Sequence, residues 1–191
     1  MKNKDKIIQT AIKLFNSSDI KSVTTNHIAS QAGVSPGNLY YHFRNKEEIV
    51  SAIFDQMVTE ELTACSQEQI NTIDQLMVFF GNLLNIYWKY RFFRFELSFL
   101  LNQDKELKKK FIDYQNFQLA DTEACLKRFT EQGIIVKVSQ KQIEAIAQNT
   151  VLILNFWIPH VKVTSKSLTK QSVGDGMNII FEILDLLKTS Q

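Results

Sequence analysis

Hydrophobic residues recur along this chain mainly at intervals of three and four, the spacing that gathers them on one face of an α-helix. The alternation of apolar and polar residues that is typical of half-buried strands is not sustained in any segment. The first apolar stripe predicts a helix that ends near residues 16–19, and it comprises Ile7, Ile8, Ala11, Ile12, Leu14 and Phe15. The pattern predicts an all-α fold.

Helix start and stop signals divide the next segment into short pieces. Thr24 or Thr25 can cap a second helix. That helix ends at Gly33, because glycine adopts the left-handed conformation of a helix C-terminus at little cost. Ser35 followed by Pro36 then marks the start of a third helix of barely two turns.

The remainder predicts a connecting helix and a larger helical body. Asn45, with Glu48 three residues later, starts a fourth helix in a capping-box arrangement that runs to about residue 64. The polar stretch CSQEQIN at residues 65–71 predicts a domain boundary. We therefore expect an N-terminal three-helix domain over residues 1–50 and a larger helical domain over residues 65–191. Helices in the second domain are predicted over residues 73–91, 92–101, 104–132, 139–159 and 173–188.

The third predicted helix has a small inner face and an outer face with unusual chemistry. Leu39 and Phe43, four residues apart, form the inner face. Small, polar and aromatic residues occupy the outward and flanking positions: Gly37, Asn38, Tyr40 and Tyr41. A helix, a tight Gly-Val-Ser turn and a short exposed helix make a helix-turn-helix, whose second helix enters the major groove of DNA.

These residues suit a DNA surface. Gly37 allows the backbone to approach DNA closely, and the amide of Asn38 can both donate to and accept from adenine. The two tyrosine hydroxyls can reach phosphates, as can His42 at the edge of the inner face. Lys46, in the first turn of the fourth helix, adds a positive charge where helix N-terminal amides also favour a phosphate.

The distribution of charge agrees with a nucleic-acid partner. Up to Glu47 the chain has seven lysines and arginines against three aspartates and glutamates, whereas the rest has 15 against 17. A basic segment before a slightly acidic body favours a polyanion at the N-terminal end. Half-buried core tyrosines are the usual alternative for a short helix, but the turn, the caps and the basic segment together favour DNA binding.

The stretch TTNHIASQAGVSPGNLYYHFRNKEEIV closely resembles the DNA-binding domain of the TetR family of bacterial repressors, and the correspondence extends over about residues 4–54. The resemblance implies a helix-turn-helix domain followed by a helical domain for ligand binding and dimerisation. The DNA contacts that it implies are Thr25, Asn38, Tyr40, Tyr41, His42 and Lys46. We add Ser35 and Gly37 from the same turn and helix to this set.

The resemblance also implies a homodimer that forms through the last two long helices. Both carry an apolar stripe, and pairs of such stripes form four-helix interfaces. The alternative is that the stripes pack only against their own chain. The expected interface residues are Ile143, Thr150, Val151, Leu154, Met177, Ile180, Phe181, Leu184 and Leu187.

The middle helices are rich in aromatic residues, which suits an apolar or aromatic ligand. If Arg91 or Arg94 faces the cavity, an acidic ligand is favoured, because arginine binds carboxylates through two hydrogen bonds. A surface position or an ion pair with Glu96 is the alternative for either arginine. The expected pocket residues are Tyr87, Trp88, Arg91, Phe95, Tyr114 and Asn155.

Three classes of function compete. The leading hypothesis is a repressor that a small ligand releases from a palindromic operator, and the alternative is a helix-turn-helix regulator controlled by a protein partner. An enzyme is disfavoured, since the three histidines lack metal-ligand spacing and no glycine-rich phosphate loop or nucleophile motif occurs. We expect no cofactor and no metal.

The chain ends and the cysteines point to an ordinary cytoplasmic protein. The N-terminal segment is basic and amphipathic but lacks the apolar core and cleavage site of a signal peptide. The longest apolar run, at residues 150–158, is interrupted by Asn155 and is too short to span a bilayer. Cys65 and Cys125 are far apart without CxxC spacing, so we expect ordinary helix residues.

Overall fold

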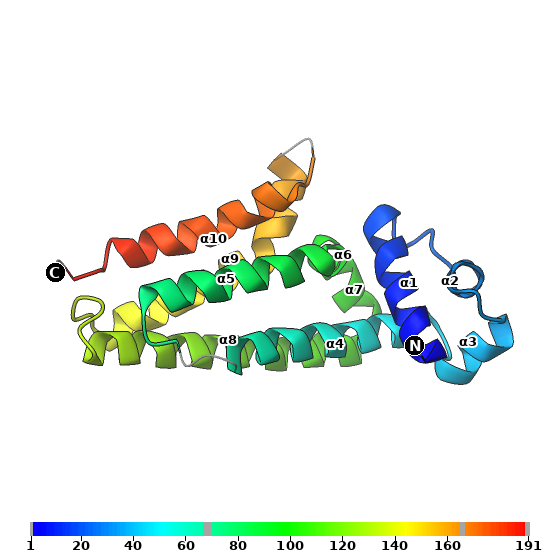
Figure 1. Ribbon diagram of the computed structural model, residues 1–191, viewed down its shortest axis with the longest axis horizontal. Coiled ribbons are helices and arrows are strands. Elements are labelled where there is room, and N and C mark those ends of the chain that lie inside the picture. Colours follow the sequence, from blue (N-terminus) through cyan, green and yellow to red (C-terminus); the bar gives the residue numbers. More distant parts are fainter. Residues whose placement is uncertain (1, 67–69, 165–166, 190–191) are drawn as a thin grey trace.

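A computed structural model describes residues 2–66, 70–164 and 167–189, and it confirms the predicted all-α fold. The first three helices gather at one end of the molecule, while the others form an elongated body (Figure 1). Within the described residues the helices are α1 (Asn3–Ser17), α2 (Thr25–Ala32), α3 (Pro36–His42), α4 (Lys46–Ser66), α5 (Ile73–Lys89), α6 (Arg91–Phe95), α7 (Leu97–Gln103), α8 (Lys105–Glu131), α9 (Gln140–Thr164) and α10 (Lys170–Asp185).

Local capping chemistry explains why α2 and α3 are short. The side chain of Thr24 accepts a hydrogen bond from the backbone N–H of His27, and α2 ends at Gly33 with φ of 66°. The hydroxyl of Ser35 accepts from the N–H of Asn38, so it caps α3 directly ahead of the proline. The predicted starts of both helices are confirmed.

α1, α2 and α3 share one core with the start of α4. Ile28 of α2, Leu39 of α3 and Ile49 of α4 are fully buried. This core continues into the body, because the rings of Phe54 in α4 and Phe93 in α6 stack with their centroids 5.1 Å apart. α4 therefore packs both in the core of the first three helices and against the body.

The body has a second core between α5, α8, α9 and α10. α8 packs against α9, α9 against α10, and α10 against α5. Gly176 permits the close contact between α9 and α10, because a Cβ at this position would lie 2.5 Å from Cγ of Trp157. No helix among the described residues has the length and apolar character needed to cross a membrane.

Three of the predicted helices differ from the structure in their bounds. The helix predicted over residues 92–101 is divided at Glu96, whose φ of −107° and ψ of 16° interrupt the helical backbone between α6 and α7. α9 continues beyond Pro159 to Thr164, where buried Val161 still packs on the core. α10 begins three residues earlier than predicted, because Thr169 forms a capping box with Ser172, and it also ends three residues earlier, at Asp185.

The predicted boundary at residues 65–71 falls between α4 and α5. α4 extends to Ser66 and α5 begins at Ile73 after the cap residue Thr72. Residues 67–69 of the predicted boundary lie outside the described residues.

Candidate DNA-binding surface and body cavity

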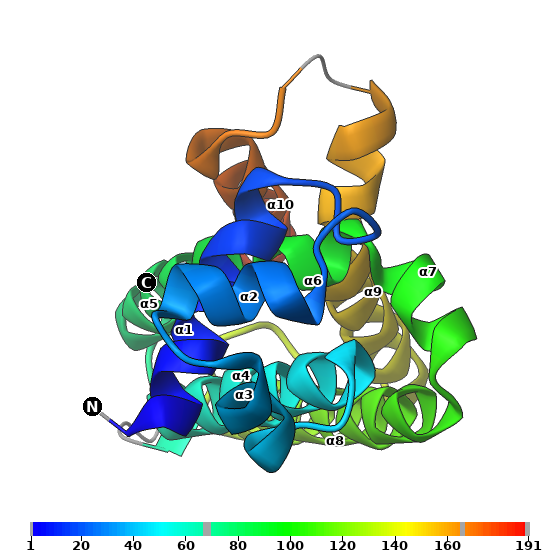
Figure 2. The ribbon, with the colours of Figure 1, turned by 90° about the vertical axis from the view of Figure 1, so that its right-hand side faces the viewer.

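α3 lies at the outer end of the molecule, where Figure 2 shows it beside α2 and turned toward the viewer. Leu39 is fully buried and Phe43 nearly so, which fixes the inner face of the helix. Tyr40 is 49% exposed and Tyr41 is 83% exposed. A side chain as exposed as Tyr41 contributes little to the core, so packing within the chain does not account for an aromatic residue there.

Contacts with α2 and within α3 orient the two tyrosines. The hydroxyl groups of Thr25 and Tyr40 form a hydrogen bond of 3.0 Å, which joins the start of α2 to the outer side of α3. The ring of Tyr41 meets the ring of His42 edge-on, with centroids 5.1 Å apart. α2 and α3 therefore present four of the predicted contact residues on one continuous surface.

The first turn of α3 leaves hydrogen-bonding capacity and space unused. The carbonyl oxygen of the Asn38 side chain is shielded from solvent and has no partner. A Cβ added to Gly37 would meet no atom of the chain within 4 Å, so internal packing does not require glycine there. Ser35 acts as the helix cap through its hydroxyl.

Lys46 has a role that local sequence patterns do not reveal. Its ammonium group donates to the backbone carbonyls of Ile20 (2.8 Å) and Val23 (3.1 Å), which lie in the loop between α1 and α2. Two of its three N–H groups thus hold this loop against the start of α4. Nearby Arg44 is far more exposed, with 89% of its side chain accessible and only a 3.8 Å ion pair to Glu48.

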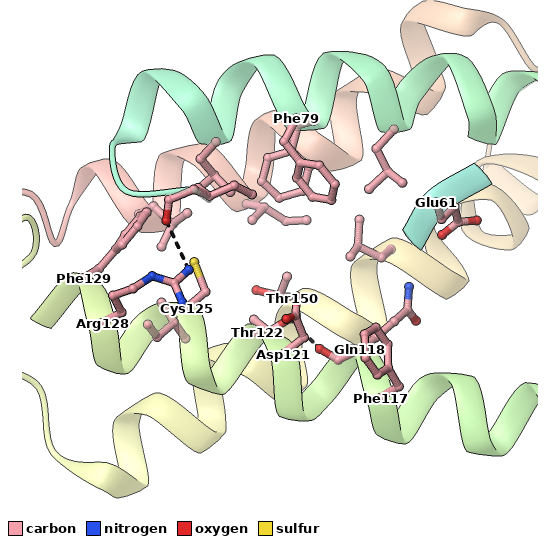
Figure 3. Close-up of a pocket in the computed structure, with 18 of the residues that line it drawn as sticks. Glu61, Phe79, Phe117, Gln118, Asp121, Thr122, Cys125, Arg128, Phe129 and Thr150 are labelled. Atoms are coloured by element: carbon pink, nitrogen blue, oxygen red, sulfur yellow. Dashed lines mark hydrogen bonds between the residues drawn. The ribbon is translucent and has the colours of Figure 1, made fainter. Parts of the chain in front are cut away.

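A cavity of about 400 Å³ lies in the body between α4, α5, α8, α9 and α10. Figure 3 shows its lining, with Phe79 on α5 facing the residues of α8 across the space. Most of the lining is apolar and comprises Leu62, Ile70, Leu76, Phe79, Phe80, Leu83, Phe117, Leu126, Phe129, Leu154, Ile180 and Leu184. The polar lining residues are Glu61, Asn71, Tyr114, Gln118, Asp121, Thr122, Cys125, Arg128 and Thr150.

Only part of the predicted pocket lines this cavity. Tyr114 does so, and Asn155 lies directly behind the wall, where its side-chain amide donates to the side-chain oxygen of Gln118 at 2.8 Å. Tyr87 is fully covered and borders a much smaller void beside Trp157. One predicted residue thus lines this cavity, and a second lies next to its wall.

The remaining three predicted pocket residues line a different hollow. Trp88, Arg91 and Phe95 face the end of α1 at the junction between the first three helices and the body. Arg91 donates to the carbonyl oxygens of Trp88 and Asn16, so it is bound to the chain itself. These three residues therefore lie at the junction, whereas the cavity of about 400 Å³ lies between the first half of α5 and α8.

A buried polar network closes the α4 end of the main cavity. Arg94 is 1% exposed, and its guanidinium donates to Glu61 at 3.2 Å and lies 3.5 Å from the ring centroid of Tyr87. The hydroxyl of Tyr114 donates to the same carboxylate. Burial and the Glu61 carboxylate hold the pKa of Tyr114 well above its ordinary value, so the hydroxyl keeps its proton. Neither alternative considered for Arg94, a surface position or an ion pair with Glu96, holds, since Arg94 is buried and pairs with Glu61 while Glu96 pairs with Lys162.

The expected dimer interface lies largely inside the chain. Leu154, Phe181 and Leu187 are partly exposed. The prediction is wrong for the other six, whose stripes face the body core and the cavity: Ile143, Thr150, Val151, Met177, Ile180 and Leu184. The large apolar side chains exposed on the same two helices include Leu152 (52%), Phe156 (40%) and Ile179 (38%).

Two family models match the chain, and together they extend over most of it. The model described as "Bacterial regulatory proteins, tetR family" matches residues 7–53. The model described as "Bacterial transcriptional repressor" matches residues 48–186, which include the whole cavity.

Individual proteins resemble the chain in two ways. The tetracycline repressor protein class C of Escherichia coli is 34% identical over 56 residues, which cover 29% of this chain and 26% of the relative, so the chain spans about a quarter of that relative's length. A TetR-family transcriptional regulator from Marinobacter aquaeolei superposes with a TM-score of 0.87 at 28% identity, covering 99% of this chain and 92% of the other. The SmeT–triclosan complex shares the fold, with a TM-score of 0.69 at 16% identity over 98% and 92% of the two chains.

Proposed function

The chain belongs to the TetR family of bacterial transcriptional repressors, and on this premise we propose that it acts as a homodimer on an inverted-repeat operator. Members of the family are DNA-binding regulators and not enzymes. In this proposal residues 1–50 bind DNA, and residues 65–191 bind a partner copy and a small, mostly apolar ligand. α4 connects the two domains. The observation that carries it is α3, which exposes two tyrosines over a buried anchor.

The outer surface of α2 and α3 supplies the proposed DNA contacts. Tyr41 is available to base edges or phosphates at the centre of the short helix, and the side-chain NH2 group of Asn38 can donate to either. Tyr40, Thr25 and His42 flank them, and Gly37 leaves room for the DNA backbone. We retain Lys46 as a phosphate contact through its third N–H, beside its contacts with the α1–α2 loop.

Tyr41→Ala is expected to weaken operator binding by at least about 10- to 100-fold, because a specific contact is worth roughly 1–3 kcal/mol and the dimer loses it in both half-sites. The fold should keep its stability, since the ring is 83% exposed. Fluorescence anisotropy with the operator and with a scrambled duplex measures the loss of specific binding. Leu186→Ala, at an 85% exposed side chain on the body, is the control and should bind like wild type. Unchanged operator affinity in Tyr41→Ala would show that α3 does not recognise the operator.

The cavity favours control by a ligand over control by a protein partner. About 400 Å³ lined mainly by leucine, isoleucine and phenylalanine suits a small apolar compound. Its wall includes Glu61 and Leu62 of α4, the helix that also packs in the core of the DNA-binding end. A ligand that binds more tightly when α4 is displaced would release DNA by the difference in its affinity for the two states.

The cavity thiol offers a direct test of ligand control. Burial raises the pKa of Cys125, so a maleimide should react slowly with it. In a Cys65→Ser variant, which leaves Cys125 as the only thiol, a ligand that releases the operator should also slow alkylation of Cys125 at least about tenfold. A compound that releases DNA while leaving the alkylation rate unchanged would place its binding site elsewhere.

A further inference from the structure

One cationic side chain of the cavity has hydrogen-bonding capacity that its own chain leaves unused. Arg128 of α8 lines the wall, and its Nη2 group donates to the backbone carbonyl of Ile70 at 3.1 Å (Figure 3). Its Nε–H is shielded from solvent and has no hydrogen-bond partner. Among the described residues, no carboxylate forms an ion pair with this guanidinium. A shielded donor on a permanent cation is costly unless an acceptor reaches it.

The other charged groups of the cavity do not neutralise Arg128. Glu61 lies at the opposite end, where Figure 3 shows it well separated from Arg128, and it is already bound by Arg94 and Tyr114. Asp121 is exposed to solvent, which screens its charge. Cys125 lies beside Arg128, but burial raises the pKa of its thiol, which therefore stays neutral.

The space between Arg128 and Glu61 is apolar on its α5 side, whereas Gln118, Asp121, Thr122 and Thr150 lie on the opposite side (Figure 3). Phe79, Phe80 and Leu83 of α5 face Leu126 and Phe129 of α8 across it. A compound that fills this space would lie against the hydrocarbon side chains of α5 along its length and meet a cation at one end only. A single guanidinium matches one carboxylate, whereas a phosphate dianion would require further cations that the described lining does not contain.

We propose that the effector is a carboxylic acid with an apolar body, held by its carboxylate at Arg128. The Nε–H is one arm of the guanidinium fork that a carboxylate accepts through two hydrogen bonds. Arg128 thereby decides which apolar compounds bind. An alcohol of the same shape offers one uncharged acceptor in place of two charged ones, and an ammonium group places a like charge beside the guanidinium. The inference rests on the proposed function, in which this cavity is the effector site.

The test uses two trios of probes that share a body and differ in the polar group. One trio is decanoate, decanol and decylamine, and the other is naphthylacetate, naphthylethanol and naphthylethylamine. Calorimetric titration of the full chain should show, in at least one trio, an acid that binds at least about tenfold more tightly than its alcohol and its amine. The same acid should release operator DNA in an anisotropy assay.

Substitution of Arg128 separates the charge from the shape of the site. Arg128→Gln should lower the affinity for the acid about tenfold or more and leave the affinity for the alcohol within about threefold. Arg128→Lys, which keeps the charge, should retain part of the preference for the acid. The matched control is Lys127→Gln, which removes the neighbouring cation that pairs with Glu123 outside the cavity lining, and it should bind all probes like wild type.

The remaining outcomes contradict either the carboxylate site or ligand-controlled release of the operator. An acid preference that survives in Arg128→Gln, an alcohol or amine that binds as tightly as the acid in both trios, or the absence of binding by all six probes would overturn the carboxylate site. If only an alcohol or amine binds and releases the operator, ligand-controlled release is supported and the carboxylate site is contradicted.

If the acid binds at Arg128 and the operator stays bound, the carboxylate site is supported and ligand-controlled release is contradicted. Circular dichroism and operator affinity without probe confirm that the variants are folded.

Discussion

Arg94→Met is expected to lower the free energy of unfolding by about 3–5 kcal/mol, because the Glu61 carboxylate would remain buried without its cation. Both side chains are nearly inaccessible, at 1% and 3% exposure, and they form a 3.2 Å pair between α6 and α4. Urea denaturation followed by circular dichroism measures the change. The matched control is Lys89→Met, which breaks the 2.6 Å pair with Glu60 at 37% and 32% exposure and should cost less than about 1 kcal/mol.

The double variant Glu61→Leu with Arg94→Met distinguishes a lost charge pair from lost packing. With both charges removed, no uncompensated ion stays in the interior, and most of the stability lost in Arg94→Met should return. A double variant as unstable as the sum of the two single variants would contradict this account. So would an Arg94→Met protein within about 1 kcal/mol of wild type.

Phe156→Glu is expected to give a monomer whose operator affinity falls about a hundredfold or more, because a monomer reads one half-site only. Phe156 is 40% exposed on α9, four residues from Leu152, so both lie on the face of α9 that its own chain leaves uncovered. A glutamate buried in a partner contact would carry an unpaired charge. Light scattering gives the mass, and anisotropy with the operator gives the affinity.

The control for the dimer variant is another exposed apolar residue on a different helix. Ile112 of α8 is 45% exposed, and Ile112→Glu should stay a dimer with normal operator affinity. A Phe156→Glu protein that scatters as a dimer would move the interface away from this face of α9. Dissociation in both variants would show that general loss of structure, and not the loss of one contact face, is responsible.

The DNA-binding end of the molecule could be predicted because its signals are local. The hydroxyl of Ser35 caps α3 by accepting from the N–H of Asn38, three residues away. Gly33 ends α2 by adopting the left-handed backbone conformation. Leu39 and Phe43 anchor α3 because helical spacing places them on one face. These contacts span a few residues, so sequence order alone determines them.

The body could not be predicted in the same way, because its decisive contacts join distant residues. Arg94 reaches Glu61 across 33 residues, and Arg128 reaches the carbonyl of Ile70 across 58. Helical periodicity identified the apolar stripes on α9 and α10, but α9 also carries apolar side chains on its exposed face. Periodicity finds a face and does not tell whether the same chain or a partner covers it, which is why six predicted interface residues lie in the core.

Selection of random duplex DNA by the purified full chain at moderate salt, followed by sequencing, tests the central claim most directly. A homodimer that reads DNA through two copies of α3 should enrich an inverted repeat whose half-sites are about one DNA turn apart. The Tyr41→Ala protein should lose that enrichment under the same conditions. Folded wild-type protein that enriches no sequence, or only a single half-site without symmetry, would contradict the account.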